Sequence, residues 1–179
     1  MEKVKLGPEP LLYPMPAVLV GAKVDEKPNF MTAAWCGIAA SKPPAISVVL
    51  QKIRHTLKGI NEQGTFSINV PSSDLAQKVD YCGIYSGRKR DKSSLFKVFY
   101  GVLETAPLIR ECPVNLECKV IHSLDLGSHI LIVGEICETY VNEDCLTGEK
   151  PDPQKIDPLI YTTGVMQYLS QTIILHRIS

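Results

Sequence analysis

Alternating hydrophobic and polar residues mark several strands along the chain. Residues 16–24 and 65–70 show the period-2 spacing of a strand that buries one face. In the second segment, Thr65, Ser67 and Asn69 fall opposite the hydrophobic face, so we expect an antiparallel sheet with one face in water. Three more strand segments follow the same logic, at residues 45–50, 114–120 and 129–141.

Helical signals are few. Residues 56–63 carry Leu57 and Ile60 one turn apart and end at Gly64, and residues 73–83 begin with a Ser-Asp pair suited to a helix start. There is no regular alternation of strands and helices, which a doubly wound sheet would need. The pattern therefore favours a mainly β protein, a closed antiparallel β-barrel with a few helices, because closure removes exposed sheet edges.

The chain has the length and composition of one globular domain. It is 45% hydrophobic and 21% charged, and residues 1–179 are expected to form a single core. The proline-rich and charged segment 148–158 is predicted to be an extended surface arm rather than a linker between two domains.

Charge and leader signals narrow the class of partner. Lysine plus arginine equal aspartate plus glutamate at 19 each, so no strong field attracts nucleic acid or an acidic membrane, and a small molecule is the expected partner. Residues 1–10 carry charges without the apolar stretch of a secretion signal. A cytoplasmic protein without a membrane segment is expected.

Six cysteines are spread along the chain with no CxxC pair, so reduced and buried thiols are expected. Cys112 and Cys118 leave the alternative of a metal ligand pair or a redox switch. Without a second ligand cluster, no metal site is predicted.

The first candidate site is the run Arg54-His55-Thr56-Leu57-Lys58, where a predicted strand meets a predicted helix. Free backbone N–H groups, the helix dipole, a hydroxyl and nearby cations would bind a phosphate there. The alternative is an ordinary capped helix beside solvated charges.

The second candidate is residues 29–35. Small residues there allow backbone amides to approach a flat ligand, and Trp35, the only tryptophan, supplies an aromatic wall. A turn at Pro28-Asn29 followed by a core strand explains the same residues.

The third candidate is residues 85–92, with four cations between Arg88 and Lys92. These cations suit a phosphate, or nucleic acid, or simply a solvated loop, and zero net charge counts against nucleic acid. His129, at the start of a strand, is either a ligand contact or a half-exposed residue at the barrel rim.

No hydrolase triad, HExxH helix, phosphate loop or GxGxxG fingerprint is present. A protein without a self-sufficient catalytic cluster is expected to depend on a bound cofactor for its chemistry.

Six segments, in order, resemble the flavin reductase-like family, particularly its flavoredoxin-type members. The resemblance covers about residues 11–162 and weakens after Tyr161. The segments are NFMTAAW from residue 29, SKPPAISVVLQ from 41, RHT from 54, GTFSINVP from 64, DYCGIYSGRKRDK from 80 and GSHILIVGEI from 127. The resemblance implies an FMN-binding split barrel of antiparallel Greek-key type.

The resemblance also implies which residues hold non-covalent FMN. The ring system would lie against residues 29–35, with Thr56 and Lys92 on the phosphate side, and no side chain is assigned as acid or base. The implied contacts are Asn29, Met31, Thr32, Ala33, Ala34, Trp35, Arg54, His55, Thr56, Ser86, Lys92 and His129. Family members are homodimers with flavin sites at the interface, so a homodimer is implied, with the 148–158 arm a candidate for reaching across.

Three functions stay open. The first is an oxidoreductase that passes electrons from NADH, NADPH or a redox protein through FMN to an acceptor. The second is a non-enzymatic FMN-binding electron carrier with the same pocket. The third, an oligonucleotide-binding barrel, is disfavoured by the neutral charge balance.

Overall fold

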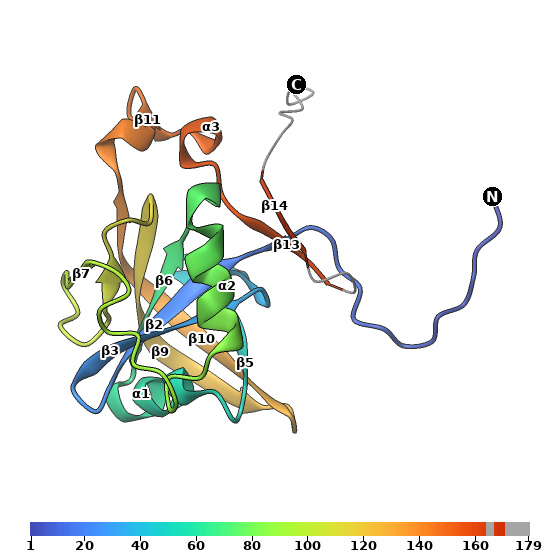
Figure 1. Ribbon diagram of the computed structural model, residues 1–179, viewed down its shortest axis with the longest axis horizontal. Helices are drawn as coiled ribbons and strands as arrows, with labels where there is room; N and C mark the ends of the chain where they lie inside the picture. Colours follow the sequence, from blue (N-terminus) through green and yellow to red (C-terminus); the bar gives the residue numbers. More distant parts are fainter. Residues whose placement is uncertain (164–166, 171–179) are drawn as a thin grey trace.

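A computed structural model of the protein describes residues 1–163 and 167–170. Seven strands make up the main sheet: β2 (Val18–Val24), β3 (Lys27–Ala33), β4 (Cys36–Ser41), β5 (Pro44–Gln51), β6 (Thr65–Val70), β9 (Val114–Asp125) and β10 (His129–Val141). They are hydrogen-bonded in the order β3-β2-β6-β9-β10-β5-β4, and every pair is antiparallel. The sheet curls into a barrel (Figure 1), so the predicted mainly β barrel is confirmed.

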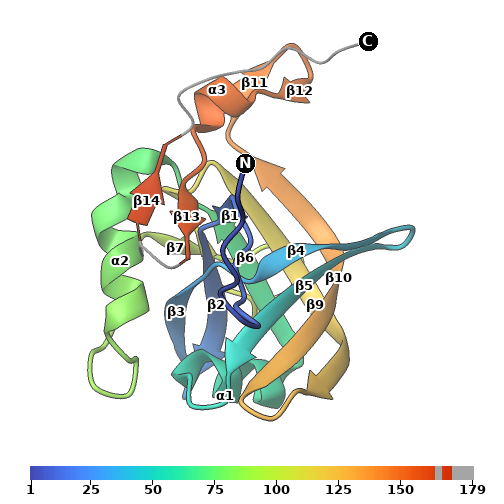
Figure 2. The ribbon, with the colours of Figure 1, turned by 90° about the vertical axis from the view of Figure 1, so that its right-hand side faces the viewer.

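Shorter elements surround the barrel. A three-stranded sheet joins β1 (Met15–Pro16), β13 (Ile160–Thr162) and β14 (Gln167–Leu169), and two small hairpins pair β7 (Val98–Phe99) with β8 (Leu108–Ile109) and β11 (Leu146–Thr147) with β12 (Lys150–Pro151). The helices are α1 (His55–Gln63), α2 (Ala76–Ile84), α3 (Pro153–Ile156) and the one-turn 3-10 helices η1 (Ser73–Leu75) and η2 (Glu143–Cys145). Helix α1 lies at one end of the barrel, and α3 with β11 and β12 lies at the other (Figures 1 and 2). None of the helices in the described part of the chain has the length and hydropathy that a membrane crossing requires.

The two edge strands of the barrel are joined by the chain itself. Strands β3 and β4 follow one another in sequence but form opposite edges of the sheet. Ala34 and Trp35 join the two edges, and the Val49 N–H of β5 donates to the Trp35 carbonyl at 2.8 Å. The segment that carries the only tryptophan therefore crosses the seam of the barrel.

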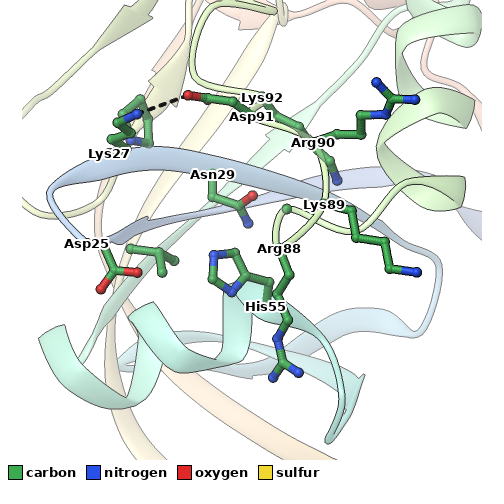
Figure 3. Close-up of a pocket in the computed structure, with 12 residues that line it drawn as sticks. Asp25, Lys27, Asn29, His55, Arg88, Lys89, Arg90, Asp91 and Lys92 are labelled. Carbon is green, nitrogen blue, oxygen red and sulfur yellow. Dashed lines mark hydrogen bonds and ion pairs between the residues drawn. The ribbon is translucent and has the colours of Figure 1, made fainter.

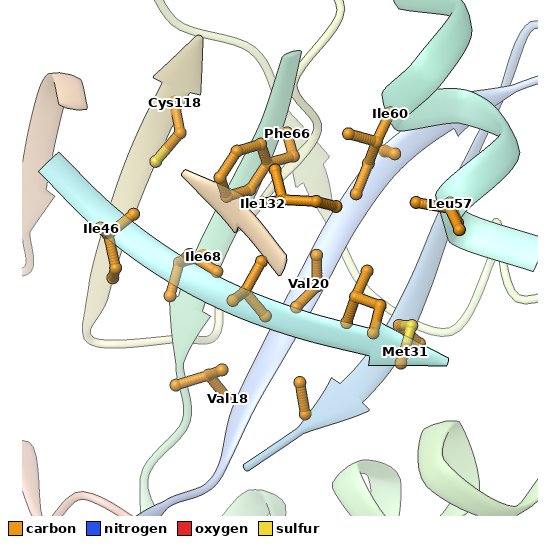
Figure 4. Packing of buried hydrophobic residues seen from close by; sticks show 14 residues of the cluster. Val18, Val20, Met31, Ile46, Leu57, Ile60, Phe66, Ile68, Cys118 and Ile132 are labelled. Carbon is orange, nitrogen blue, oxygen red and sulfur yellow. The ribbon is translucent and has the colours of Figure 1, made fainter. Parts of the chain in front are cut away.

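Two hydrophobic clusters hold the fold together. The first fills the barrel with side chains from all of its central strands and from α1, among them Val20, Ile60, Phe66 and Ile132 (Figure 4). The second lies on the other side of β2 and β3, where Leu19 and Phe30 pack under α2. Because β2 and β3 are covered on both faces, they are buried almost throughout.

The predicted strands and helices lie where the pattern placed them, and two details differ: the helix at residues 73–83 and the turn before β3. Helix α1 ends at Gly64, whose φ of 66° is the left-handed conformation that glycine adopts readily. The predicted helix 73–83 is split into η1 and α2. The turn suggested at Pro28-Asn29 lies instead at Asp25-Glu26, where both residues have positive φ, and β3 already begins at Lys27.

The prediction of a wet face on β6 was wrong. Thr65, Ser67 and Asn69 are all buried, because the chain between β7 and β9 covers this face. Asn69 accepts a hydrogen bond from the Ile109 N–H at 2.9 Å, and the Asn115 side chain donates to the same oxygen at 2.8 Å. Small polar side chains at alternate positions match a solvated face and a hydrogen-bonded buried face equally well.

The segment 148–158 lies mostly at the surface, as predicted, but the prediction that it is extended was wrong. The segment contains β12 and α3, and Asp152 caps α3 by accepting a hydrogen bond from the Gln154 N–H at 2.9 Å. Ile156 is buried. Proline at the first helical position starts a helix as readily as it extends a loop, and that explains the error.

The cysteines match the prediction of buried thiols for four of the six residues. Cys82, Cys112, Cys118 and Cys145 are buried, and all six are free. Cys118 packs inside the barrel and Cys112 in the cluster under α2. The two lie in separate clusters and therefore do not form a ligand or disulfide pair with each other.

Candidate functional site

Two hollows flank the first turn of α1 and share no lining residue. The first, which we call the slot, has a volume of about 420 Å³ and is lined by β3, its continuation through Trp35, the end of β5, and residues Arg54, His129 and Tyr161. The second, which we call the basic hollow, has a volume of about 520 Å³ and lies between the β2–β3 turn, His55 and the loop Gly87–Lys92.

One wall of the slot is aromatic. The rings of Trp35 and His129 stack with centroids 4.9 Å apart and planes inclined by 27°. His129 begins β10 and pairs with Gln51 at the end of β5, and the other edge of β5 pairs with the start of β4, which Trp35 precedes. Trp35 remains 39% exposed, so the stacked pair presents an open aromatic surface.

The residues of β3 that line the slot are fixed from behind. Met31 and Ala33 belong to the barrel core, and the Thr32 hydroxyl donates a hydrogen bond to the Val79 carbonyl of α2. Arg54 closes the end of the slot toward α1, where its Nη1 donates to the Gly83 carbonyl at 3.1 Å. The slot therefore has along one side a strand that is held by the core and by α2, with one guanidinium at its end.

The start of α1 has the features of an anion site. Its N-cap residue, Arg54, makes no side-chain capping hydrogen bond, and the first turn carries no acidic residue. Thr56, in that turn, is 1% exposed and accepts a hydrogen bond from the Asn29 Nδ2 at 2.7 Å. The first turn thus presents backbone N–H groups at the positive end of a helix dipole.

His55 has a buried ring nitrogen without a partner. Its Nδ1 atom makes no hydrogen bond to the described residues. Burial of the ring lowers the pKa of His55 below its ordinary value, and the positive charge of Arg88 lowers it further. A neutral imidazole with an unpaired nitrogen beside a helix start is a polar group that a ligand can satisfy.

The loop from Ser86 to Lys92 lies against the same helix start (Figure 3). Ser86 shapes its turn, because the Ser86 carbonyl accepts hydrogen bonds from the Lys89 and Arg90 N–H groups, both at 3.0 Å. Ser86 lines neither the slot nor the basic hollow. At the other end of the loop, Asp91 pairs with Lys27 of β3 at 3.1 Å.

Lys92 is buried beneath this loop. Its Nζ donates to the Phe30 carbonyl of β3 at 2.9 Å and to the Cys82 carbonyl of α2 at 3.0 Å. Loss of hydration lowers the pKa of Lys92. The ammonium therefore ties the loop to the strand and the helix behind the site, and its reach to a phosphate stays a prediction.

The structure gathers most of the predicted site residues around α1. Met31, Thr32, Ala33, Ala34, Trp35, Arg54 and His129 line the slot, and Asn29, His55 and Lys92 line the basic hollow. Thr56 lies buried between them, and Ser86 stands apart in the turn.

Sequence reasoning missed the residues that cover the slot. Tyr161 and Thr163 line it, and Tyr161 packs against Tyr168 with ring centroids 5.4 Å apart. The aromatic pair borders a third hollow of about 470 Å³ that shares Thr32, Ala34 and Arg54. No local pattern in the sequence marks these two tyrosines. The Tyr13 hydroxyl donates to the Thr163 carbonyl, so the N-terminal segment helps to hold this cover.

Within residues 1–163 and 167–170, no three His, Cys, Asp or Glu side chains come together as metal ligands.

The family model described as "Flavin reductase like domain" matches residues 11–170. The chain belongs to the flavin reductase-like family. That membership gives it a flavin-related redox function, and the predicted resemblance is confirmed.

Solved structures support the same family. The flavoredoxin of Methanosarcina acetivorans is 42% identical, superposes with a TM-score of 0.96, and the match covers 99% of this chain and 96% of that one. The flavoredoxin of Desulfovibrio vulgaris (Miyazaki F) is 38% identical with a TM-score of 0.91, over 99% and 97% of the two chains. The predicted split-barrel fold is therefore confirmed.

A ferric-chelate reductase (NAD(P)H) of Archaeoglobus fulgidus is 34% identical over 110 residues, which cover 58% of this chain and 62% of that protein.

Proposed function

We propose that this protein is an oxidoreductase of the flavoredoxin type, which holds FMN non-covalently in the slot. Electrons enter from a nicotinamide dinucleotide or a protein donor and leave to a further acceptor. The observation that carries the proposal is the continuity of a flat aromatic slot with an uncapped helix start.

The chain's own groups fit FMN better than an unphosphorylated flavin. The aromatic pair Trp35 and His129 suits a planar ring system. The first turn of α1, without a side-chain cap or an acidic residue, suits a phosphate, and the unpaired Nδ1 of His55 offers one more polar contact. Riboflavin would leave the helix start without an anion.

FMN, when bound, supplies the redox chemistry by accepting and releasing electrons and protons on its ring. The protein's residues bind and orient it. Ala33 and Ala34 allow close approach to the backbone at the end of β3, Arg54 supplies positive charge, and Tyr161 adds an aromatic ring to the lining of the slot. The proposal assigns no side chain of the slot as a proton donor or acceptor.

The names of the relatives support a reductase. Two structures with high identity are flavoredoxins, and a more distant relative is a ferric-chelate reductase that uses NAD(P)H.

A homodimer also belongs to the proposal. Strand β4 is an edge strand whose Ile38 is 74% exposed, and the partly exposed Trp35 directly precedes it. The cytoplasmic location stays a prediction.

The first test is the colour of the purified protein. We expect a yellow protein with a flavin spectrum, and a released chromophore with the mass of FMN. A preparation that stays colourless after incubation with excess FMN would refute the proposal.

The second test separates the phosphate from the ring. Thr56→Ala should raise the dissociation constant of FMN by about tenfold, which corresponds to about 1.4 kcal/mol, and should change that of riboflavin much less. Thr139→Ala, on the exposed part of β10, is the matched control. Equal losses for FMN and riboflavin would contradict a phosphate at the start of α1.

The third test separates an enzyme from an electron carrier. Steady-state oxidation of NADH and NADPH by the FMN-loaded protein should exceed that by free FMN. Tight FMN binding without such turnover would favour the carrier.

A further inference from the structure

The third hollow, which we call the tyrosine hollow, opens beside the slot. It has a volume of about 470 Å³, within the range of pockets for small ligands, and lies between the end of β3, helix α2 and the rings of Tyr161 and Tyr168. Four residues line both the slot and this hollow: Thr32, Ala34, Arg54 and Tyr161. A molecule in the tyrosine hollow would therefore lie next to a flavin held in the slot.

Gly83 keeps this hollow open. It lies in the last turn of α2, and glycine in a helix is less favourable than alanine by about 0.5–1 kcal/mol. Its φ is not positive, and a Cβ atom there would meet the Thr32 Cβ at 3.4 Å and the Tyr168 Oη at 3.8 Å, which are ordinary contact distances. Neither the backbone nor close packing requires glycine at this position, and a larger side chain would extend into the hollow.

Arg54 supplies an unpaired guanidinium to the hollow. Its Nη1 donates to the Gly83 carbonyl at 3.1 Å, and within the described part of the chain the guanidinium makes no ion pair and no second hydrogen bond. The remaining N–H groups form the planar fork that binds a carboxylate through two parallel hydrogen bonds. The hollow therefore offers its strongest polar contact to a carboxylate.

The other groups of the hollow suit a planar ligand with a single charge. The Tyr161 and Tyr168 rings, with centroids 5.4 Å apart, form an aromatic wall. Burial, with a smaller contribution from the charge of Asp80, raises the pKa of Tyr168 to about 12, so its hydroxyl stays neutral. Asp80 is exposed on α2, lines the hollow and makes no ion pair with any residue that the structure describes. Its negative charge opposes a second anionic group on the ligand.

We propose that the tyrosine hollow is the site of the electron acceptor, and that the acceptor is a small planar molecule with one carboxylate. The carboxylate binds Arg54, and the planar part lies against the tyrosine rings. The inference rests on the proposed function, because it assigns the slot to FMN. With a quinone as the acceptor, one turnover passes two electrons and two protons from FMNH₂ to the quinone, which leaves as the hydroquinone.

The first experiment measures binding to the FMN-loaded protein by calorimetry. The probes are benzoate, which is planar and anionic, benzamide, which has the same shape without the charge, and cyclohexanecarboxylate, which has the charge without the planar ring. We expect benzoate to bind about tenfold more tightly than either of the other two, because only benzoate suits both Arg54 and the aromatic wall.

Two variants test the location of the bound benzoate. Gly83→Leu should fill the hollow and weaken benzoate binding by about tenfold or more, while FMN should still bind because Gly83 does not line the slot. Gln77→Leu, which adds the same side chain at an exposed position of α2, is the matched control. Asp80→Asn should strengthen benzoate binding by about two- to threefold, because it removes a like charge from the hollow, and should not change that of benzamide. Asp80→Asn decides the location by itself if the leucine also disturbs FMN.

The second experiment tests the role as acceptor site. The FMN-loaded protein is reduced with one equivalent of dithionite and mixed by stopped flow with 1,4-naphthoquinone-2-carboxylate or with the uncharged 1,4-naphthoquinone. Gly83→Leu should slow reoxidation of the flavin by the carboxylate by about tenfold relative to Gln77→Leu. It should change reoxidation by the uncharged quinone much less, because that quinone lacks the contact with Arg54.

Two results would overturn the inference. If benzoate does not bind the FMN-loaded protein, or binds Gly83→Leu equally well, the tyrosine hollow is not a carboxylate site. If Gly83→Leu leaves both reoxidation rates unchanged, the hollow is not the acceptor site. In both cases FMN is still bound and the proposed function stands, whereas failure of the proposed function would show as absence of flavin binding in the wild type.

Discussion

At the scale of one residue, Lys92 is a buried charge that has a structural role. It is 3% exposed, no carboxylate of the described chain pairs with it, and its ammonium faces two backbone carbonyls. Burial of an unpaired charge opposes folding, while the two hydrogen bonds favour it. The lowered pKa of Lys92 reflects the first of these effects.

Replacement by methionine measures which effect is larger. Lys92→Met keeps the length of the side chain but leaves the Phe30 and Cys82 carbonyls without a donor. Each lost hydrogen bond should lower the free energy of unfolding by about 1–3 kcal/mol, and removal of the buried charge should offset part of that loss. We expect a net loss of about 2 kcal/mol in the free energy of unfolding, measured by urea denaturation at neutral pH. Lys97→Met, at an exposed position, should change it by less than about 0.5 kcal/mol. A more stable Lys92→Met protein would show that charge burial dominates.

At the scale of elements, Glu117 organises the chain between β7 and β8. Its carboxylate is fully buried in β9 and accepts backbone N–H groups of Gly101, Val102 and Leu103 at 2.8–3.1 Å. The Tyr140 hydroxyl of β10 donates to it at 3.0 Å. One carboxylate thus fixes three consecutive residues of the segment that covers β6.

We expect Glu117→Gln to destabilise this cover. The amide has one acceptor oxygen instead of two, and its NH₂ group faces N–H donors, so the free energy of unfolding should fall by about 2–3 kcal/mol. Amide hydrogen exchange of residues 101–103 should accelerate more than that of β5. Tyr140→Phe removes one neutral donor from the same carboxylate and should lower the free energy of unfolding by only about 1 kcal/mol. Equal effects of the two variants would show that the loop contacts contribute little.

At the scale of the whole molecule, buried thiols make stability depend on pH. Loss of hydration raises the pKa of the buried Cys82 to about 11 and that of the partly exposed Cys36 to about 12, and burial also raises the pKa of Cys112 and Cys118. In the unfolded chain these thiols lose protons above about pH 8.5. The unfolded state then binds fewer protons than the folded state, so stability falls as pH rises.

We therefore expect an alkaline loss of stability that begins near pH 8.5 and continues to about pH 12. Each buried thiol contributes a slope of up to about 1.4 kcal/mol per pH unit, partly opposed by Lys92, whose lowered pKa acts in the other direction. Denaturation under reducing conditions at several pH values measures the slope. Cys118→Val should reduce it, whereas Val79→Ala should lower stability by the same amount at each pH. An unchanged slope in Cys118→Val would contradict the explanation.

The proposed dimer is also a property of the whole molecule. Ile38→Asp places a charge on the exposed edge strand β4, where burial against a second copy would be costly. We expect sedimentation velocity to show a dimer for the wild type and a monomer for Ile38→Asp. Thermal denaturation of the variant checks that the monomer is still folded. The exposed Leu124→Asp, on β9, is the control. A wild-type monomer would refute the dimer.

Local patterns were enough for five of the seven barrel strands (β2, β5, β6, β9 and β10), for the helix that ends before Gly64 and for the family. Those features depend on neighbours in the chain: period-2 spacing, a glycine in the left-handed conformation, and six ordered segments. The same patterns also placed Arg54, Thr56 and Trp35 in candidate sites, because helix starts and lone aromatic residues have local signatures.

Packing of distant segments, in contrast, sets which of those residues meet. The Trp35–His129 stack, the burial of Ser67 and Asn69 and the burial of Lys92 all depend on closure of the barrel and on the chain that covers it. A polar residue at alternate positions has the same sequence pattern whether water or a backbone partner satisfies it. Local order therefore specifies most of the barrel strands and the family, whereas the hollows depend on three-dimensional packing, because hydrogen-bond partners and neighbours from distant strands do not follow from local order.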